Sequence, residues 1–204
     1  MVFQGTPPPA GQRKRCGELH RAMCLTASLF FACLAFPAQA NTGNDAIWLS
    51  VDTQALTLSV MRADVAVQVF ENIAIGSNGA TLHKQVGDEM TPLGKFRINV
   101  IRPSKRFRLF MGIDYPTMED ALRALEEKRI GATEFHALEQ AWQAGRAPPQ
   151  DTRLGGHLGI HGVGAGSLEI HNRFNWTNGC IAVTNEQLEE LAALVRVGAT
   201  IVIH

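Results

Sequence analysis

Apolar and polar residues alternate with a period of two soon after the first forty residues. The alternation is clear in three successive segments, 47–52, 56–61 and 65–70. A period of two sends neighbouring side chains to opposite faces of a strand, so these segments predict strands joined by tight hairpins. The turn between the second and third strand is expected at 62–64, and a further strand is expected at 94–101.

The apolar spacing changes from the strand period to the helix period in the middle of the chain. Residues 118–128 and 133–144 place Ala, Leu, Glu and Gln at helical spacing, and Gly145 with Pro148 and Pro149 ends the second helix. We therefore expect a helical insertion within about 102–153, between strands of the sheet. Two interpretations stay open for it: a lid over a substrate cleft, or a pair of helices that only packs.

Short apolar runs return in the last third of the chain. Segments 158–161 and 180–183 predict strands, Thr184 and Gln187 form the capping box of a helix, and 199–203 predicts a closing strand at the edge of the sheet. The pattern as a whole predicts a mixed, β-dominated α+β fold of packed β-sheets with a helical insertion. Residues 41–204 are long enough for one domain with its own core.

The first forty residues resemble an export signal. A basic stretch at 13–21 precedes an apolar run at 22–36, and Ala38-Gln39-Ala40 is a typical cleavage site. We expect cleavage after Ala40, with no stable membrane span, because the apolar run is shorter than the roughly 20 residues that a span needs. Retention as an anchor and lipidation at Cys33 are the alternatives. The remaining 164 residues carry a net charge of −3, which argues against nucleic acid as a partner.

Three of the four cysteines, Cys16, Cys24 and Cys33, lie within the predicted signal, so the exported chain keeps only Cys180. A single thiol in an oxidising compartment cannot form an internal disulfide. It is therefore either a buried, inert apolar residue or a reactive group.

The residues around Cys180 favour a reactive group. Gly179 can adopt backbone angles that direct successive amide N–H groups into one small volume, where they stabilise an oxyanion. Thr177 can orient the loop through its hydroxyl, and Trp176 can supply an apolar wall. A turn that contains a buried cysteine is the alternative.

A thiol needs a nearby base because its ordinary pKa, near 8.5, leaves it largely protonated at neutral pH. His161 is the best candidate, since it ends an apolar strand and Gly162 follows it. His171 is the rival base, although its polar neighbours favour a solvated loop position. Together with His157 and Cys180, the two histidines would also make a zinc site, but glycines around His157 speak against it.

Three blocks of this sequence match the motifs of one family in order and spacing. They are Gly87-Asp88 with Thr91-Pro92-Leu93-Gly94-Lys95-Phe96, then Ile160-His161-Gly162, then Trp176-Thr177-Asn178-Gly179-Cys180-Ile181-Ala182. With them, residues 46–203 resemble the L,D-transpeptidase catalytic domain, also called the YkuD-like domain. Further residues at 114–121 and 155–156 are similar to a periplasmic subgroup of this family.

The resemblance implies roles for seven residues. It implies Cys180 as nucleophile, His161 as proton donor and acceptor, and an oxyanion hole from backbone amides around Gly179 and Cys180. Residues that position the oxyanion or the substrate are then Gly179, Asn178, Thr177, Trp176 and Gly162. Many relatives have His where this chain has Asn178, and asparagine cannot relay protons. No metal, nucleotide or prosthetic group is implied.

The implied activity is acyl transfer on peptidoglycan stem peptides in the periplasm, through a thioester on Cys180. An amine acceptor would give a cross-link or a tethered protein, such as an outer-membrane protein. Water would instead make the protein an L,D-hydrolase that trims stem peptides or releases tethered proteins. An alternative of another class is a non-catalytic module that binds the cell wall.

Overall fold

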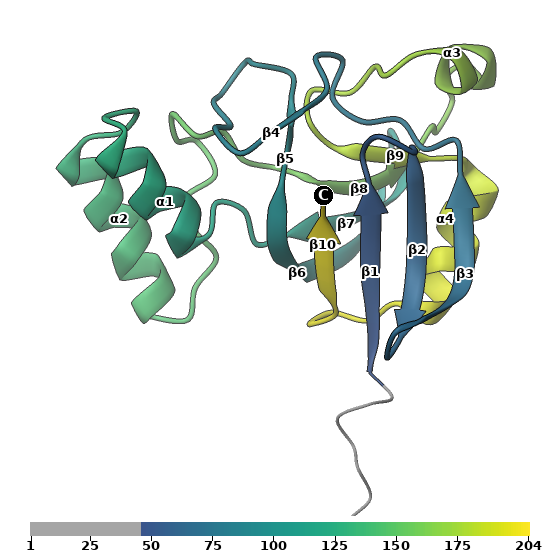
Figure 1. Ribbon diagram of the computed structural model, residues 1–204, viewed down its shortest axis with the longest axis horizontal. Helices are drawn as coiled ribbons and strands as arrows, with labels where there is room; N and C mark the ends of the chain where they lie inside the picture. Colours follow the sequence, from purple (N-terminus) through teal and green to yellow (C-terminus); the bar gives the residue numbers. More distant parts are fainter. Residues whose placement is uncertain (1–45) are drawn as a thin grey trace, which may run out of the picture. The chain divides into compact units, whose positions relative to one another are not determined.

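The structure is a computed structural model that describes residues 46–204, so the predicted signal at 1–40 and its three cysteines lie outside the described residues. One eight-stranded sheet dominates, in the order β3-β2-β1-β10-β6-β7-β8-β9, and a small two-stranded sheet pairs β4 with β5 (Figure 1). The strands are β1 Ile47–Asp52, β2 Thr57–Arg62, β3 Val65–Glu71, β4 Ala80–Thr81, β5 Thr91–Pro92, β6 Gly94–Ser104, β7 Arg108–Ile113, β8 Gly159–Gly162, β9 Ile181–Val183 and β10 Thr200–Ile203. The helices are α1 Met118–Glu126, α2 Ala132–Gln143, α3 Leu168–Arg173 and α4 Asn185–Leu194.

The first three strands form the predicted antiparallel hairpins. Strand β1 pairs with β2 and β2 with β3, and Ala63, at the predicted turn, has a φ of +50°. Alternate residues of β1, Leu49 and Val51, are fully buried, as the period of two requires.

Strand β10 lies in the interior of the sheet, so the expectation of an edge strand at 199–203 was wrong. It pairs in parallel with β1 and antiparallel with β6. Ile201 and Ile203 face the core while both backbone edges are bonded. An edge strand and an interior strand with one buried face show the same alternation, so sequence alone does not distinguish them.

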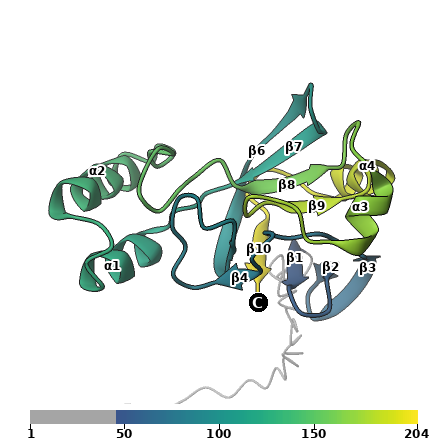
Figure 2. The same cartoon turned by 90° about the horizontal axis from the view of Figure 1, so that it is seen from above.

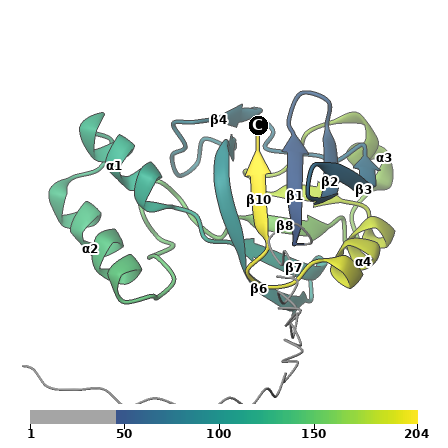
Figure 3. The same cartoon turned by 60° about the horizontal axis from the view of Figure 1, so that its bottom comes forward.

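Strands β6 and β7 form a long hairpin that extends outward from the rest of the sheet (Figure 2). Residues 102–113 thus belong to this hairpin, and the first helix begins only at Met118, well after the start of the predicted range of 102–153. Helices α1 and α2 match the predicted helices closely and lie to one side of the sheet (Figure 3). A capping box between Thr117 and Asp120 starts α1. The inner faces of the two helices are buried at Ala121, Ala124 and Leu138.

The segment that follows β3, at one edge of the sheet, pairs with β9 at the other edge. After β3, the first strand in the sheet order, Ala74 forms two backbone hydrogen bonds with Ala182 of β9, the last strand. This contact curls the sheet around a core that includes Phe96, Ile160 and Ile181. Helix α4, which starts with the predicted Thr184–Gln187 capping box, packs against β8.

The fold confirms the predicted class, a mixed, sheet-dominated architecture with few helices. Strands β4, β5 and β7 and helix α3 were not predicted. No helix in residues 46–204 is both long enough and apolar enough to span a membrane.

Candidate active site

His161 and Cys180 are brought together by two neighbouring parallel strands. His161 of β8 pairs with Ala182 of β9, and Cys180 lies two residues before Ala182. Paired residues share a face, so His161 and Ala182 do; Cys180 directly precedes β9, and extending the alternation of β9 back by one residue puts Cys180 on that same face. This register places the Cα atoms of His161 and Cys180 about 8 Å apart, which their side chains can span.

Backbone and aromatic contacts fix the ring of His161. Its Nδ1–H donates to the carbonyl of Gly162 at 2.9 Å, and a carbonyl can only accept. Neutral His161 therefore carries its proton on Nδ1 and leaves the Nε2 lone pair free to act as a base. Phe107 stacks on the ring at 4.0 Å between centroids, and Trp176 contacts it edge-on at 5.7 Å.

Burial keeps His161 neutral. Only 3% of the residue is exposed, and this burial lowers the pKa of the imidazole below its ordinary value. The hydrogen bond to Gly162 acts in the opposite direction, while the charge of Arg106 lowers the pKa further. A neutral histidine at neutral pH is ready to accept a proton.

Cys180 is half-buried, and its thiol points at a backbone carbonyl. Sγ–H donates to the carbonyl of His157 at 3.7 Å, and no hydrogen bond joins it to His161 in residues 46–204. Burial raises the pKa of the Cys180 thiol to about 11. The resting pair is therefore a neutral thiol and a neutral imidazole, and the thiol must rotate toward His161 before the proton can move.

Thr177 holds the turn that precedes Cys180. Its buried hydroxyl donates to the carbonyl of Cys180 at 2.6 Å and accepts from the amide of Gly179 at 3.1 Å. Gly179 has a φ of +118°, and a methyl group at this position would lie 2.5 Å from the carbonyl oxygen of Met90. Only glycine fits a turn that has this φ and so little space.

These bonds change the expected set of oxyanion donors. The N–H of Gly179 is already bonded to Thr177, so it is not free to stabilise an oxyanion as the sequence suggested. The N–H of Cys180 has no hydrogen-bond acceptor within the described part of the chain. That amide is therefore the available donor next to the thiol.

Gly162 lets α4 approach the strand that carries His161. A methyl group at Gly162 would lie 2.6 Å from Oδ1 of Asn185, the first residue of α4. The side chain of Asn185 bonds both the amide and the carbonyl of Gly164, at 2.8 and 2.9 Å. These bonds fix the end of β8 directly behind His161.

His171 is buried, so the expectation of a solvated loop histidine was wrong. It lies in α3, only 3% exposed, and its Nδ1 accepts from the indole N–H of Trp176 at 3.3 Å. Its polar neighbours Asn172 and Arg173 suggested exposure, but α3 turns His171 inward. His171 therefore supports Trp176, which in turn contacts His161.

Two cavities flank the turn. One of about 380 Å³, lined by Arg106, Phe107 and Trp176 among others, lies on the side of His161. The other, of about 240 Å³, is lined by Lys84, Asn178 and Gly155 among others. No residue of α1 or α2 lines either cavity.

The geometry provides no metal centre within residues 46–204. No group of three His, Cys, Asp or Glu side chains in this range is placed to hold a metal ion. The four residues of the zinc alternative, His157, His161, His171 and Cys180, therefore form no such group.

The family model of the L,D-transpeptidase catalytic domain (YkuD) matches residues 44–203. No curated protein matches the chain. Among solved structures, the helical cell shape determining protein Pgp2 from Campylobacter jejuni is similar, with a TM-score of 0.55 and 17% identity over 78% of this chain and 47% of that one.

Two further similar structures are described as L,D-transpeptidases. The L,D-transpeptidase from Xylanimonas cellulosilytica has a TM-score of 0.46 and 11% identity, over 80% of this chain and 62% of that one. The L,D-transpeptidase from Mycobacterium smegmatis has a TM-score of 0.44 and 15% identity, over 78% and 58%. The chain thus spans about half the length of Pgp2 and about three fifths of the length of these two L,D-transpeptidases.

Proposed function

The chain belongs to the L,D-transpeptidase catalytic domain family, and on that premise we propose that it transfers acyl groups between peptidoglycan stem peptides through a thioester on Cys180. The observation that carries the proposal is the placement of His161, with Nε2 free, on the same face as Cys180 and one strand away. We assign the donor and the acceptor to the two cavities that flank the cysteine turn, of which one is lined by the residues that contact His161 and the other by Asn178.

The first half-reaction forms the thioester. Nε2 of His161 takes the proton of the Cys180 thiol as Sγ attacks the carbonyl of an L-centred peptide bond, and an S–C bond forms. The amide of Cys180 donates to the oxyanion, an effect worth roughly 3 kcal/mol for one donor in comparable sites. The C–N bond then breaks, and His161 returns its proton to the leaving amine.

The second half-reaction uses the same groups in reverse. An acceptor amine loses a proton to His161 and attacks the thioester, a C–N bond forms, and the C–S bond breaks. The Cys180 thiol recovers its proton. The acceptor in this proposal is the amine of a second stem peptide or of a protein, including an outer-membrane protein. From the predicted export signal we infer that the reaction takes place in the periplasm.

The test is product mass after incubating the purified protein with stem tetrapeptides, with and without an amine acceptor. We expect a product that contains both donor and acceptor, and no such product from Cys180→Ala. His161→Ala should retain the fold and lose turnover, since nothing else takes the thiol proton.

The alternatives give other outcomes. Free acid products alone, even with abundant acceptor, would make the protein an L,D-hydrolase. No product and no covalent adduct of Cys180 with a carbapenem would reject both enzyme activities and leave the wall-binding module.

A further inference from the structure

Lys84 is a buried cation close to the cysteine turn, and no motif in the sequence singles it out. It is only 4% exposed and forms an ion pair with Asp88. Its Nζ also donates to the carbonyl of Gln85 at 3.1 Å. The carboxylate of Asp88 accepts from the amides of Gln85 and Met90 at 2.7 and 2.9 Å. The segment 84–90 therefore closes around one ion pair and holds the charge of Lys84 in place.

This fixed charge lies against the turn that carries the nucleophile. A methyl group at Gly179 would lie 3.3 Å from Cε of Lys84. Lys84 and Asn178 line the same cavity, together with the carboxylate-bearing Glu89. The positive charge of Lys84 also lowers the pKa of the Cys180 thiol, against the effect of burial.

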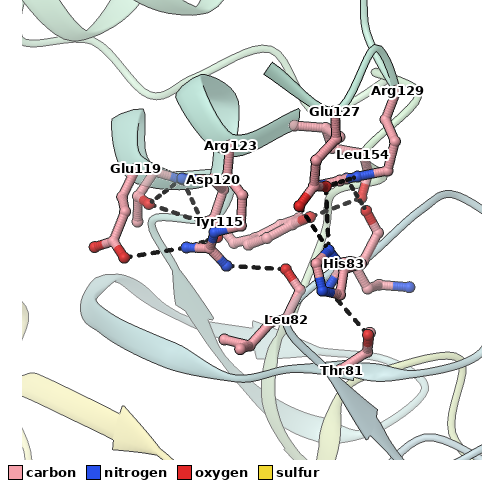
Figure 4. A network of polar contacts seen from close by, with 12 residues as sticks. Thr81, Leu82, His83, Tyr115, Glu119, Asp120, Arg123, Glu127, Arg129 and Leu154 are labelled. Carbon is pink, nitrogen blue, oxygen red and sulfur yellow. Dashed lines mark hydrogen bonds and ion pairs between the residues drawn. The ribbon is translucent and has the colours of Figure 1, made fainter. Parts of the chain in front are cut away.

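Helix α1 and the residues after it hold the backbone of Lys84 from the other side. Nη1 of Arg129 donates to the carbonyl of Lys84 at 3.1 Å. Nη1 of Arg123 donates to the carbonyl of Leu82 at 3.0 Å (Figure 4). Glu127 accepts from Arg129 at 2.6 Å and pairs with His83. The helical insertion thus contacts the cysteine turn indirectly, through the segment 82–84.

We propose that Lys84 is a positioning residue for Cys180, whose fixed ammonium supports the Gly179 turn and stabilises the negative charge that develops on Sγ. This role rests on the proposed function, because stabilising charge on Sγ matters only if Cys180 is the nucleophile. The charged groups that face the thiol region are Lys84, its partner Asp88 and Glu89 in the shared cavity, and the titratable group across from it is neutral His161 on the neighbouring strand. Arg129, paired with Glu127, lies behind Lys84.

The test is the pH dependence of the alkylation of Cys180 by iodoacetamide, with the modified site identified by peptide mass. Lys84→Met removes the cation, so the thiol pKa should rise by about 1 and the alkylation rate at neutral pH should fall about tenfold. Lys84→Arg should restore most of the rate because the charge returns. Lys95→Met, which removes an exposed lysine on β6, should leave the profile unchanged.

Asp88→Asn separates electrostatics from packing. It leaves the charge of Lys84 without its neutralising partner, so the thiol pKa should fall, the opposite of the change in Lys84→Met. A purely structural role would move both variants in the same direction, and that result would overturn the inference. Circular dichroism checks the fold of each variant; if Lys84→Met does not fold, Lys84→Gln and the double variant Lys84→Met/Asp88→Asn replace it.

Alkylation requires no peptidoglycan substrate. The proposed function therefore fails by the absence of products, while the role of Lys84 fails by an unchanged alkylation profile.

Discussion

At Cys180, the surroundings act on the pKa of the thiol in opposite directions. Burial raises its pKa to about 11, while the charge of Lys84 and a backbone hydrogen bond from Gly159 lower it. The neighbouring His161 is neutral because burial lowers its pKa. The pair is therefore set for proton transfer during the attack and not for a preformed thiolate and imidazolium.

The acid limb of the pH profile should report His161. Its pKa is lowered, so the neutral base persists as pH falls below the ordinary value of 6.5, and kcat/KM should decline only as pH passes through the lowered pKa. Arg106→Gln removes a positive charge that contributes to this lowering. The acid limb of that variant should therefore move to higher pH, as measured with a stem tetrapeptide donor. A limb that stays in place would mean that Arg106 does not act on His161.

Thr177 should be required for its hydroxyl and not for its shape. Thr177→Val keeps the side-chain shape but leaves the buried amide of Gly179 without its acceptor, which costs about 1–3 kcal/mol. We expect a matching loss in the free energy of unfolding, measured in urea, and a fall in turnover. Thr177→Ser, which keeps the hydroxyl, is the control and should retain most of both. Equal losses in the two variants would contradict this role.

At the scale of elements, short segments fix the site from behind. Helix α4 is tied to the end of β8 through Asn185, and α3 supports Trp176 through His171. The first contact holds Gly164, which follows His161 in the chain, and the second holds Trp176, whose ring contacts that of His161. The precision of the site thus depends on how closely these elements approach one another.

Gly162→Ala should force α4 away from β8. The added methyl group would lie 2.6 Å from Asn185 Oδ1 and 3.1 Å from the carbonyl oxygen of Phe107, so we expect a loss of about 1–3 kcal/mol in the free energy of unfolding. The control is Gly131→Ala, at the start of α2, where nothing lies within 4 Å of the added methyl group and φ is −94°. Thermal melts of the two variants check this. Similar Tm values would show that α4 can move without cost.

At the scale of the whole molecule, closure of the sheet creates the site. The contact of Ala74 with Ala182 joins the chain after β3 to β9, and Thr177 pairs there with the segment 75–77. Helices α1 and α2 of the insertion lie to one side and line neither cavity next to the turn, and the bonds of Arg123 and Arg129 support the site through residues 82–84. Support of this kind differs from a lid, which would touch the substrate.

Two variants of the insertion separate these roles. Ala137→Lys places a charge on the exposed face of α2 and should leave KM for a stem tetrapeptide unchanged, since no residue of α2 lines either cavity. Arg129→Ala removes the bond to the carbonyl of Lys84 and should slow alkylation of Cys180 several-fold, since Lys84 is then less fixed. A changed KM in Ala137→Lys together with normal alkylation in Arg129→Ala would favour the lid.

Local patterns in the sequence determined most of the elements. The period of two predicted β1, β2 and β3, helical spacing predicted α1 and α2, and the Thr184–Gln187 capping box predicted the start of α4. These features depend on neighbours within four residues, so the sequence contains them directly. The motifs around His161 and Cys180 likewise indicated the family.

Only the tertiary structure decided how distant segments meet. The interior position of β10, the burial of His171 and the approach of Lys84 to the turn before Cys180 all depend on segments whose meeting no local pattern encodes. A local pattern fixes which face of an element is apolar, but not which partner covers that face. Packing of the whole chain makes that choice, and with it the electrostatic environment of the thiol.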